Sequence, residues 1–201
     1  MIKRLIIITG ILVLASCASN PPQPLGTETI PQYQSQLSDL SEVNYWFIKG
    51  RISVQTTEDA FSASFAWRRE EGYQRLEITG MLGQQYALLE IFPDYATLTV
   101  QDSAPVQARN IDALMWSQLG FTIPVALLTD WIKAYPTSST QPSIRINESG
   151  MIQAMSFQNW QVTYRKYVDY PDYENVQLPA RLTVTNERET IKLAIKTWQA
   201  L

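Results

Sequence analysis

Apolar and polar residues alternate with a period of two through most of the chain after residue 45, and this pattern constrains the fold more than any other feature. In the segment 48–55, Ile48, Ile52 and Val54 alternate with charged or polar residues, and 61–68 repeats the pattern. Such alternation predicts strands with one apolar and one polar face. Further strands are expected at 73–79, 85–92, 96–101, 106–109, 143–147, 151–157, 160–167, 180–186 and 189–198. The short turns between them predict an antiparallel meander.

Helical patterns occur before and in the middle of this strand region. A short amphipathic helix is expected from residue 31 to 40, where apolar side chains recur at helical spacing. Asn110 suits the N-cap of a helix at 111–119, and a second helix is expected at 124–134. The segment 168–178 reads as a surface loop. These elements predict a mainly β, α+β fold, in which one curved antiparallel sheet of about eleven strands forms a half-open barrel closed by a helical lid.

The N-terminal residues predict an exported lipoprotein. A basic start precedes an apolar run at 5–13, which is too short to span a bilayer core about 30 Å thick and suits a signal peptide, residues 1–16. The run ends at Leu14-Ala15-Ser16-Cys17, which resembles the lipobox of bacterial lipoproteins. Cys17 is the only cysteine in the chain. The alternative is an ordinary secretory signal followed by an incidental cysteine.

A lipobox implies that Cys17 carries diacylglycerol and an N-linked acyl chain. Residues 17–31, rich in Pro, Ser, Thr and Asn, would form a flexible tether, and 32–201 would form the folded domain. Ala18, rather than Asp, follows the cysteine. We therefore expect an anchor in the outer membrane, with the domain facing the periplasm.

Composition argues against several classes of function. Without Lys3 and Arg4, the 16 basic residues fall to 14 against 19 acidic ones, a net charge of −5. We see no basic stripe in the sequence, so we expect neither nucleic-acid binding nor attraction to anionic lipid. With no His and no second Cys, we expect no metal site. The acidic residues are scattered without a pair suited to acid–base catalysis, which disfavours an enzyme.

Several segments, taken in their order and spacing, resemble the LolB family of outer-membrane lipoprotein receptors. The resemblance also rests on the lipobox. The segments are 45–51, 63–67, the Leu82-Gly83 turn after 73–79, GFTIPVALLTDWIKAYP at 120–136, Asn159-Trp160-Gln161-Val162 with Tyr164, and Ile191-Lys192-Leu193 with Trp198.

The resemblance implies a hydrophobic cavity between sheet and lid that holds the acyl chains of another lipoprotein. It implies a periplasmic carrier of the LolA type as the donor, the inner leaflet of the outer membrane as the destination, and no cofactor. We expect a monomer that incorporates lipoproteins into that membrane. The alternatives are a lipid-anchored structural or envelope-assembly lipoprotein with a filled β-barrel core and, more remotely, a glycosidase-like or peptidoglycan-acting lipoprotein.

The family's membrane-targeting loop carries an exposed leucine, which corresponds here to Leu82 between Met81 and Gly83. Met81 stands where the family commonly has Pro. Judged from the residues alone, an apolar side chain at such a turn either projects toward a membrane or folds back on the core.

Eleven apolar residues are candidates for lining the cavity. Four tryptophans match family positions, and the others are expected to share their faces by alternation or helical spacing. Aromatic residues, 11% of the chain, suit a packed β-rich core as well as a cavity wall, so each candidate has both interpretations. The candidates are Ile52, Phe65, Trp67, Leu76, Ile78, Leu88, Leu128, Trp131, Trp160, Ile195 and Trp198.

Overall fold

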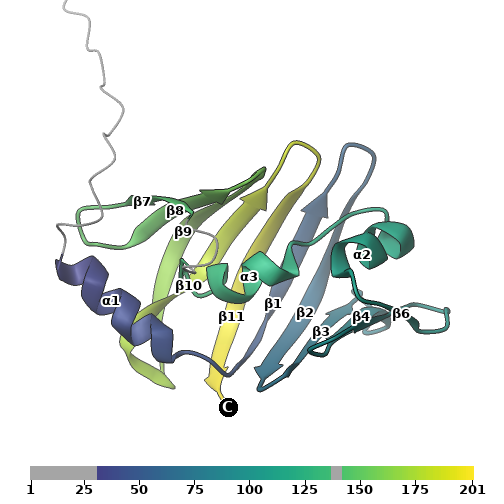
Figure 1. Ribbon diagram of the computed structural model, residues 1–201, viewed down its shortest axis with the longest axis horizontal. Helices are drawn as coiled ribbons and strands as arrows, with labels where there is room; N and C mark the ends of the chain where they lie inside the picture. The colour runs from purple at the N-terminus through teal and green to yellow at the C-terminus, as the bar shows by residue number, and fades with distance from the viewer. Residues whose placement is uncertain (1–30, 137–141) are drawn as a thin grey trace, which may run out of the picture.

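The computed structural model describes residues 31–136 and 142–201, which form one open antiparallel sheet of 11 strands with three helices (Figure 1). This confirms the predicted fold class. The predictions for the signal peptide, for Cys17 and for residues 17–30 of the tether lie outside the described residues, so they stay predictions.

The elements follow the predicted order. The helices are α1 Pro31–Glu42, α2 Ile111–Leu119 and α3 Val125–Trp131. The strands are β1 Trp46–Gln55, β2 Ala60–Glu70, β3 Tyr73–Thr79, β4 Gln85–Ile91, β5 Ala96–Val100, β6 Val106–Ala108, β7 Ser143–Ile146, β8 Ile152–Phe157, β9 Trp160–Tyr170, β10 Tyr173–Thr185 and β11 Thr190–Ala200.

The sheet consists of two meanders joined through its centre. Strands β1 to β6 form one half and β7 to β11 the other, and β1 pairs with β11 between them. The edge strands β6 and β7 are therefore consecutive in the chain but lie at opposite sides of the sheet. The connection between them contains α2 and α3, which cross one face of the sheet (Figure 1). We call this covered face the inner face and the opposite one the outer face.

Alternation along the strands separates the two faces. On β1, Ile48, Ile52 and Val54 are buried on the inner face, whereas Lys49 and Arg51 are exposed on the outer face. The inner face continues into one apolar cluster that includes residues of all three helices. Burial of this cluster supplies the main stabilisation of the fold.

Irregular pairing bends the sheet at its centre. Thr197 pairs with Lys49 and Ile195 with Gly50, so Lys196 is an extra residue on β11. A Cβ atom on Gly50 would collide with the backbone carbonyl of Ala194. Bulges of this kind increase local twist and curvature. Position 50 beside the β11 bulge therefore requires glycine.

The helix predicted at 111–119 is confirmed with its caps. The Asn110 side chain accepts a hydrogen bond from the Ala113 amide at 2.9 Å, and Gly120 ends the helix with φ of 75°. The next helix is shorter than predicted, because α3 ends at Trp131 and Ala134 already has φ of 59°.

The prediction of a surface loop at 168–178 is wrong. Strands β9 and β10 extend through this segment and meet at a turn at 171–172. Tyr170, Val176 and Leu178 are buried. The pairing between the strands is irregular here. Bulges interrupt the period of two, which is why the sequence pattern resembled a loop.

Candidate functional site

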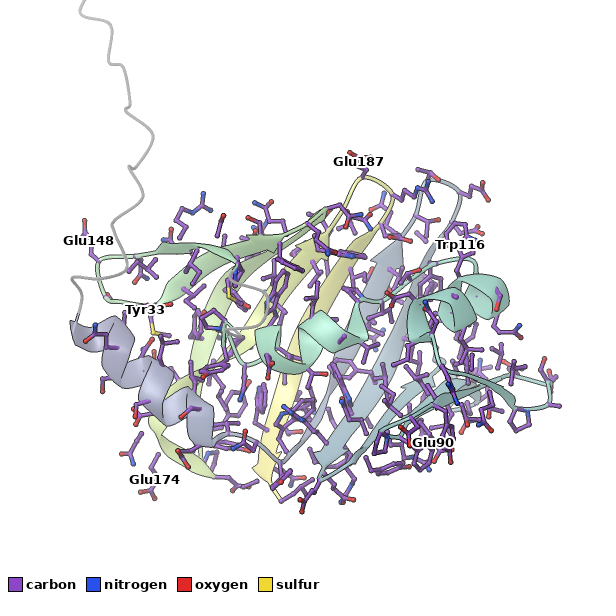
Figure 2. All side chains as sticks on the ribbon, in the orientation of Figure 1. Tyr33, Glu90, Trp116, Glu148, Glu174 and Glu187 are labelled. Atoms are coloured by element: carbon purple, nitrogen blue, oxygen red, sulfur yellow. The ribbon has the colours of Figure 1, made fainter. Side chains whose placement is uncertain are left out.

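The candidate site is the inner face of the sheet together with the segment that covers it. We define the lid segment as residues 120–135, which include α3. Six of its larger apolar side chains are buried in the apolar cluster that covers the sheet, and they are Phe121, Ile123, Val125, Leu128, Trp131 and Ile132. Figure 2 shows side chains filling the space between the helices and the sheet.

Ten of the eleven cavity candidates lie together in the buried apolar cluster. They come from both halves of the sheet and from α3, so the fold unites residues that are far apart in the chain. They are Ile52, Phe65, Trp67, Leu76, Ile78, Leu128, Trp131, Trp160, Ile195 and Trp198. Whether each contacts an acyl chain stays a prediction.

Leu88 was expected on the same face, and this expectation is wrong. Leu88 pairs with Glu77 on β3 and with Thr99 on β5, and it is half-buried on the outer face. Leu89, which pairs with Leu76, is the inward residue. Two adjacent leucines make the phase of alternation ambiguous, and a register irregularity after Ile78 adds to the ambiguity.

Trp46 belongs to the same cluster, although it was not among the residues predicted from the sequence. Its side chain is fully buried, and its ring packs edge-on against Trp67 and Trp198 with centroid distances of 5.1 and 5.5 Å. Such pairs stabilise beyond their buried area. The period of two on β1, extended back from Ile48, could have identified it.

A few polar contacts hold the lid segment to the sheet. The Gln74 side-chain oxygen accepts hydrogen bonds from Trp67 and from Thr129 of α3, both at 3.2 Å. The Tyr164 hydroxyl donates to the carbonyl of Trp131 at 2.6 Å, and burial raises its pKa well above the usual range, so it stays protonated. At the start of the lid segment, the Thr122 amide donates to buried Glu189 at 3.2 Å.

Lys133 joins the end of the lid segment to α1. Its buried ammonium donates to the carbonyls of Leu40 and Val43 at 3.0 and 2.8 Å and lies over the ring of Tyr135. A cation at the C-terminal end of a helix interacts favourably with the helix dipole. Burial nevertheless lowers the pKa of Lys133 to about 8.

Two indole groups in the interior lack hydrogen-bond partners among the described residues. The Nε1 atoms of Trp46 and Trp131 are both buried, and neither donates to a protein group. An unpaired buried donor costs on the order of 1–3 kcal/mol. A ligand that brought carbonyl oxygens into the inner face could therefore bind these donors.

The turn between β3 and β4 projects two apolar side chains into solvent. Met81 is 85% exposed and Leu82 is 93% exposed. The turn is closed by a hydrogen bond from the Gly83 amide to the Gly80 carbonyl at 3.1 Å, and Gly83 has φ of 85°. The Leu82 amide donates to the side chain of Gln84 at 3.2 Å. The alternative in which Leu82 folds back on the core is therefore wrong.

Side chains leave little space beneath the helices in this structure. Beneath α1, between Tyr33 and Tyr167, a space measures about 10 Å³. A cleft of about 420 Å³ opens at the start of the lid segment, beside Thr122, Trp160 and Glu189. Two larger grooves, described below, open on the outer face. Within the described ranges, no group of acidic, His or Cys side chains could hold a metal ion. None of the three helices is both long and apolar enough to cross a bilayer.

Together, the open half-barrel and its covered apolar face define a protein of the class that shelters an apolar ligand between a curved sheet and a helical lid. The family model described as "Outer membrane lipoprotein LolB" matches residues 44–198. The chain belongs to the LolB family, which confirms the resemblance found in the sequence and the expected outer-membrane lipoprotein class.

Curated relatives match nearly the whole chain. A protein from Aeromonas hydrophila named outer-membrane lipoprotein LolB is 28% identical, over 98% of this chain and 97% of its own length. A protein of the same name from Ectopseudomonas mendocina is 27% identical, over 99% and 97% of the two chains. The crystal structure of a LolA-superfamily protein from Nitrosomonas europaea shares the fold, with a TM-score of 0.54 at 10% identity over 84% and 93% of the two chains.

Proposed function

We propose that this protein is an outer-membrane receptor that takes the acyl chains of other lipoproteins onto its inner face and inserts them into the inner leaflet of that membrane. The observation that carries the proposal is the continuous apolar inner face beneath a short lid segment, in a chain of the LolB family. A periplasmic carrier of the LolA type would supply the cargo.

The energetics of acyl chains explain why such a receptor is needed. Each buried methylene is worth about 0.8 kcal/mol, so a lipoprotein with three acyl chains does not cross water unaided. A receptor that binds these chains more tightly than the carrier and less tightly than the bilayer completes the transfer without a cofactor. The proposal therefore describes a binding protein and not an enzyme.

Acyl chains reach the inner face only if the lid segment moves. In this structure its side chains, including Leu128 and Trp131, occupy the inner face. Few polar contacts oppose its movement, notably those of Gln74, Tyr164 and Glu189. Acyl chains would replace the apolar contacts that the lid segment gives up, so opening costs little once cargo is present.

The two unpaired indole donors support the same site. The ester and amide carbonyls of a lipidated cysteine would enter the interior with the acyl chains and need donors there. Trp46 and Trp131 supply two buried N–H groups that no described protein group uses. The inner face thus offers apolar surface for the chains and donors for their polar linkages.

The anchor completes the proposal. Processing at the lipobox would remove residues 1–16 and attach lipid to Cys17, and residues 17–31 would tether the domain 32–201 to the membrane. A monomer suffices, since one chain contains the whole inner face.

A transfer assay tests this function directly. The mature chain with Cys17→Ala, which has no acyl anchor of its own, is mixed with carrier that holds radiolabelled lipoprotein. We expect the label to move to the receptor in a soluble complex. A variant that is folded by circular dichroism but accepts no label would contradict the proposal.

A matched pair on β2 locates the binding face. Ala63 is buried on the inner face and Ala66 lies on the outer face. We expect Ala63→Leu to lower acceptance by filling space at the site, whereas Ala66→Leu should accept cargo normally. Equal acceptance by both folded variants would favour the alternative, a structural lipoprotein with a filled core.

A further inference from the structure

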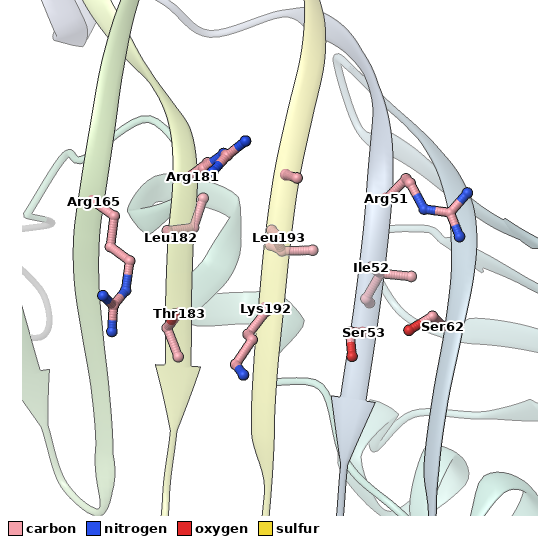
Figure 3. A pocket seen from close by; sticks show the side chains of 11 residues that line it. Arg51, Ile52, Ser53, Ser62, Arg165, Arg181, Leu182, Thr183, Lys192 and Leu193 are labelled. Atoms are coloured by element: carbon pink, nitrogen blue, oxygen red, sulfur yellow. The ribbon is translucent and has the colours of Figure 1, made fainter.

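The outer face carries a concentration of positive charge that the sequence did not reveal. Two adjoining grooves of about 600 and 790 Å³ cross its centre, and no acidic residue lines either of them. Figure 3 shows the first groove on β9, β10, β11, β1 and β2. Seven exposed basic side chains line the two grooves, and we call them the basic face: Lys49, Arg51, Arg165, Lys166, Arg181, Lys192 and Lys196. The expectation that the chain lacks a basic stripe is therefore wrong.

Pairing across the sheet assembles this charge from separate strands. Lys166 pairs with Arg181, Arg181 with Ala194, and Ala194 with Arg51. Lys192 pairs with Ser53 in the neighbouring row. These residues are scattered along the chain, but antiparallel pairing places them in adjacent rows on one surface.

Two bulges increase the charge. Arg165 is an extra residue on β9, because Arg181 pairs with Lys166 while Leu182 already pairs with Tyr164. Lys196 is the extra residue on β11. Each bulge thus adds an exposed basic side chain to the outer face.

The acidic residues beside the basic face already have partners. Glu77 is separated from Lys49 by Ala66 and is paired with Arg75 at 3.3 Å. Asp169 of β9 accepts a hydrogen bond from Gln177 at 3.1 Å. Glu148, Glu174 and Glu187 lie at the margins of the molecule, at turns or strand ends (Figure 2). The net acidic chain therefore presents one strongly cationic surface.

This surface adjoins the exposed apolar turn. The row that contains Arg51 continues through Ser64 to Thr79, which lines the larger groove. Thr79 is the last residue of β3 and directly precedes the turn with Met81 and Leu82. Cationic and apolar groups thus lie next to each other at one side of the molecule.

We propose that the basic face binds the head groups of anionic phospholipids, beside the turn whose Leu82 corresponds to the family's membrane-targeting leucine. The two features have the combination that holds proteins at a membrane surface, which is charge attraction together with shallow apolar insertion. The interaction fixes which side of the domain faces the bilayer. It does not depend on the acyl-chain site on the inner face, so the two can fail separately.

A bilayer fits these features better than an acidic protein does. The seven side chains are exposed and form no salt bridge with the described residues, so they suit mobile phosphate groups rather than a partner of fixed shape. Two apolar side chains that are 85% and 93% exposed on a single turn suit insertion into lipid.

Vesicle binding tests the proposal. The mature chain with Cys17→Ala is first checked for folding by circular dichroism. It is then sedimented with two kinds of vesicle, one of phosphatidylcholine alone and one of phosphatidylcholine with roughly 30% phosphatidylglycerol. We expect binding to the anionic vesicles only, and weaker binding at high salt. Arg51→Gln/Arg181→Gln/Lys192→Gln should lower that binding by roughly tenfold or more.

A control of equal charge change separates position from net charge. Arg109, Arg145 and Arg188 are exposed and line neither groove, Arg145 being on the edge strand β7. Their triple Gln variant should bind nearly as well as the unmodified chain. Equal losses in both triple variants, or no loss in either, would overturn the proposal. It would also be overturned if the first variant bound vesicles normally but no longer accepted cargo from the carrier, since the basic face would then recognise the carrier.

Discussion

Replacing Leu82 by Ser should slow delivery of cargo to the membrane without weakening its acceptance. Leu82 is 93% exposed, so the substitution should leave the free energy of unfolding nearly unchanged. Moving a leucine side chain from water into the acyl region gains about 1.5–3 kcal/mol. Since about 1.4 kcal/mol corresponds to a factor of ten, membrane engagement by this variant should fall roughly 10- to 100-fold.

The assay begins with the complex between the receptor and radiolabelled lipoprotein, adds vesicles, and follows the rate at which label becomes membrane-bound. Leu201→Ser is the matched control, because Leu201 is also an exposed leucine but lies at the C-terminus. Leu82→Glu should deliver still more slowly, because a carboxylate enters the acyl region at greater cost. Delivery by Leu82→Ser at the unmodified rate, or an equal loss in Leu201→Ser, would refute the role of the turn.

Three further predictions concern the stability of the fold. The pKa of Lys133 is about 8 in the folded chain against 10.5 in the unfolded chain, so the unfolded chain holds more protons between these values. Stability should therefore rise from pH 8 to pH 10, by on the order of 1–2 kcal/mol in urea titrations, and Lys133→Met should lack this rise. Gly50→Ala should destabilise by about 1–3 kcal/mol because its Cβ meets the carbonyl of Ala194, and unchanged urea unfolding would contradict the contact. Asn110→Ala should cost about 1 kcal/mol in the same measurement through loss of the α2 cap, whereas Asn110→Ser should retain most of it.

The sequence predicts most helices and strands, because alternation and helix caps determine them locally and no irregular strand pairing overrides these signals. The strand at 73–79 and the helix at 111–119 have the expected bounds, since alternation defines the first and Asn110 and Gly120 cap the second. Local patterns become unreliable where strands are irregular. The 168–178 segment reads as a loop, yet pairing with neighbouring strands makes it a hairpin.

The sequence predicts which apolar residues face inward where the strands are regular, but not where the register is ambiguous. Alternation places Ile52, Phe65 and Leu76 on the inner face. It cannot choose between Leu88 and Leu89, because register depends on pairing with β3. The basic face could not be predicted from the sequence for a similar reason, because its residues come together only when strands that are distant in sequence pair.

Contact between cargo acyl chains and the inner face is the central feature of the proposed function, and it can be measured directly by fluorescence quenching. Five of the six tryptophans are buried and only Trp116 is exposed, on α2, so Trp116→Phe restricts the fluorescence to buried indoles. The chain with Cys17→Ala/Trp116→Phe then receives a lipoprotein with brominated acyl chains, since bromine quenches indole fluorescence on contact. We expect strong quenching on transfer and none with the same cargo lacking bromine. Stable transfer of brominated cargo without quenching would contradict the proposed function, because the acyl chains would then lie elsewhere on the protein.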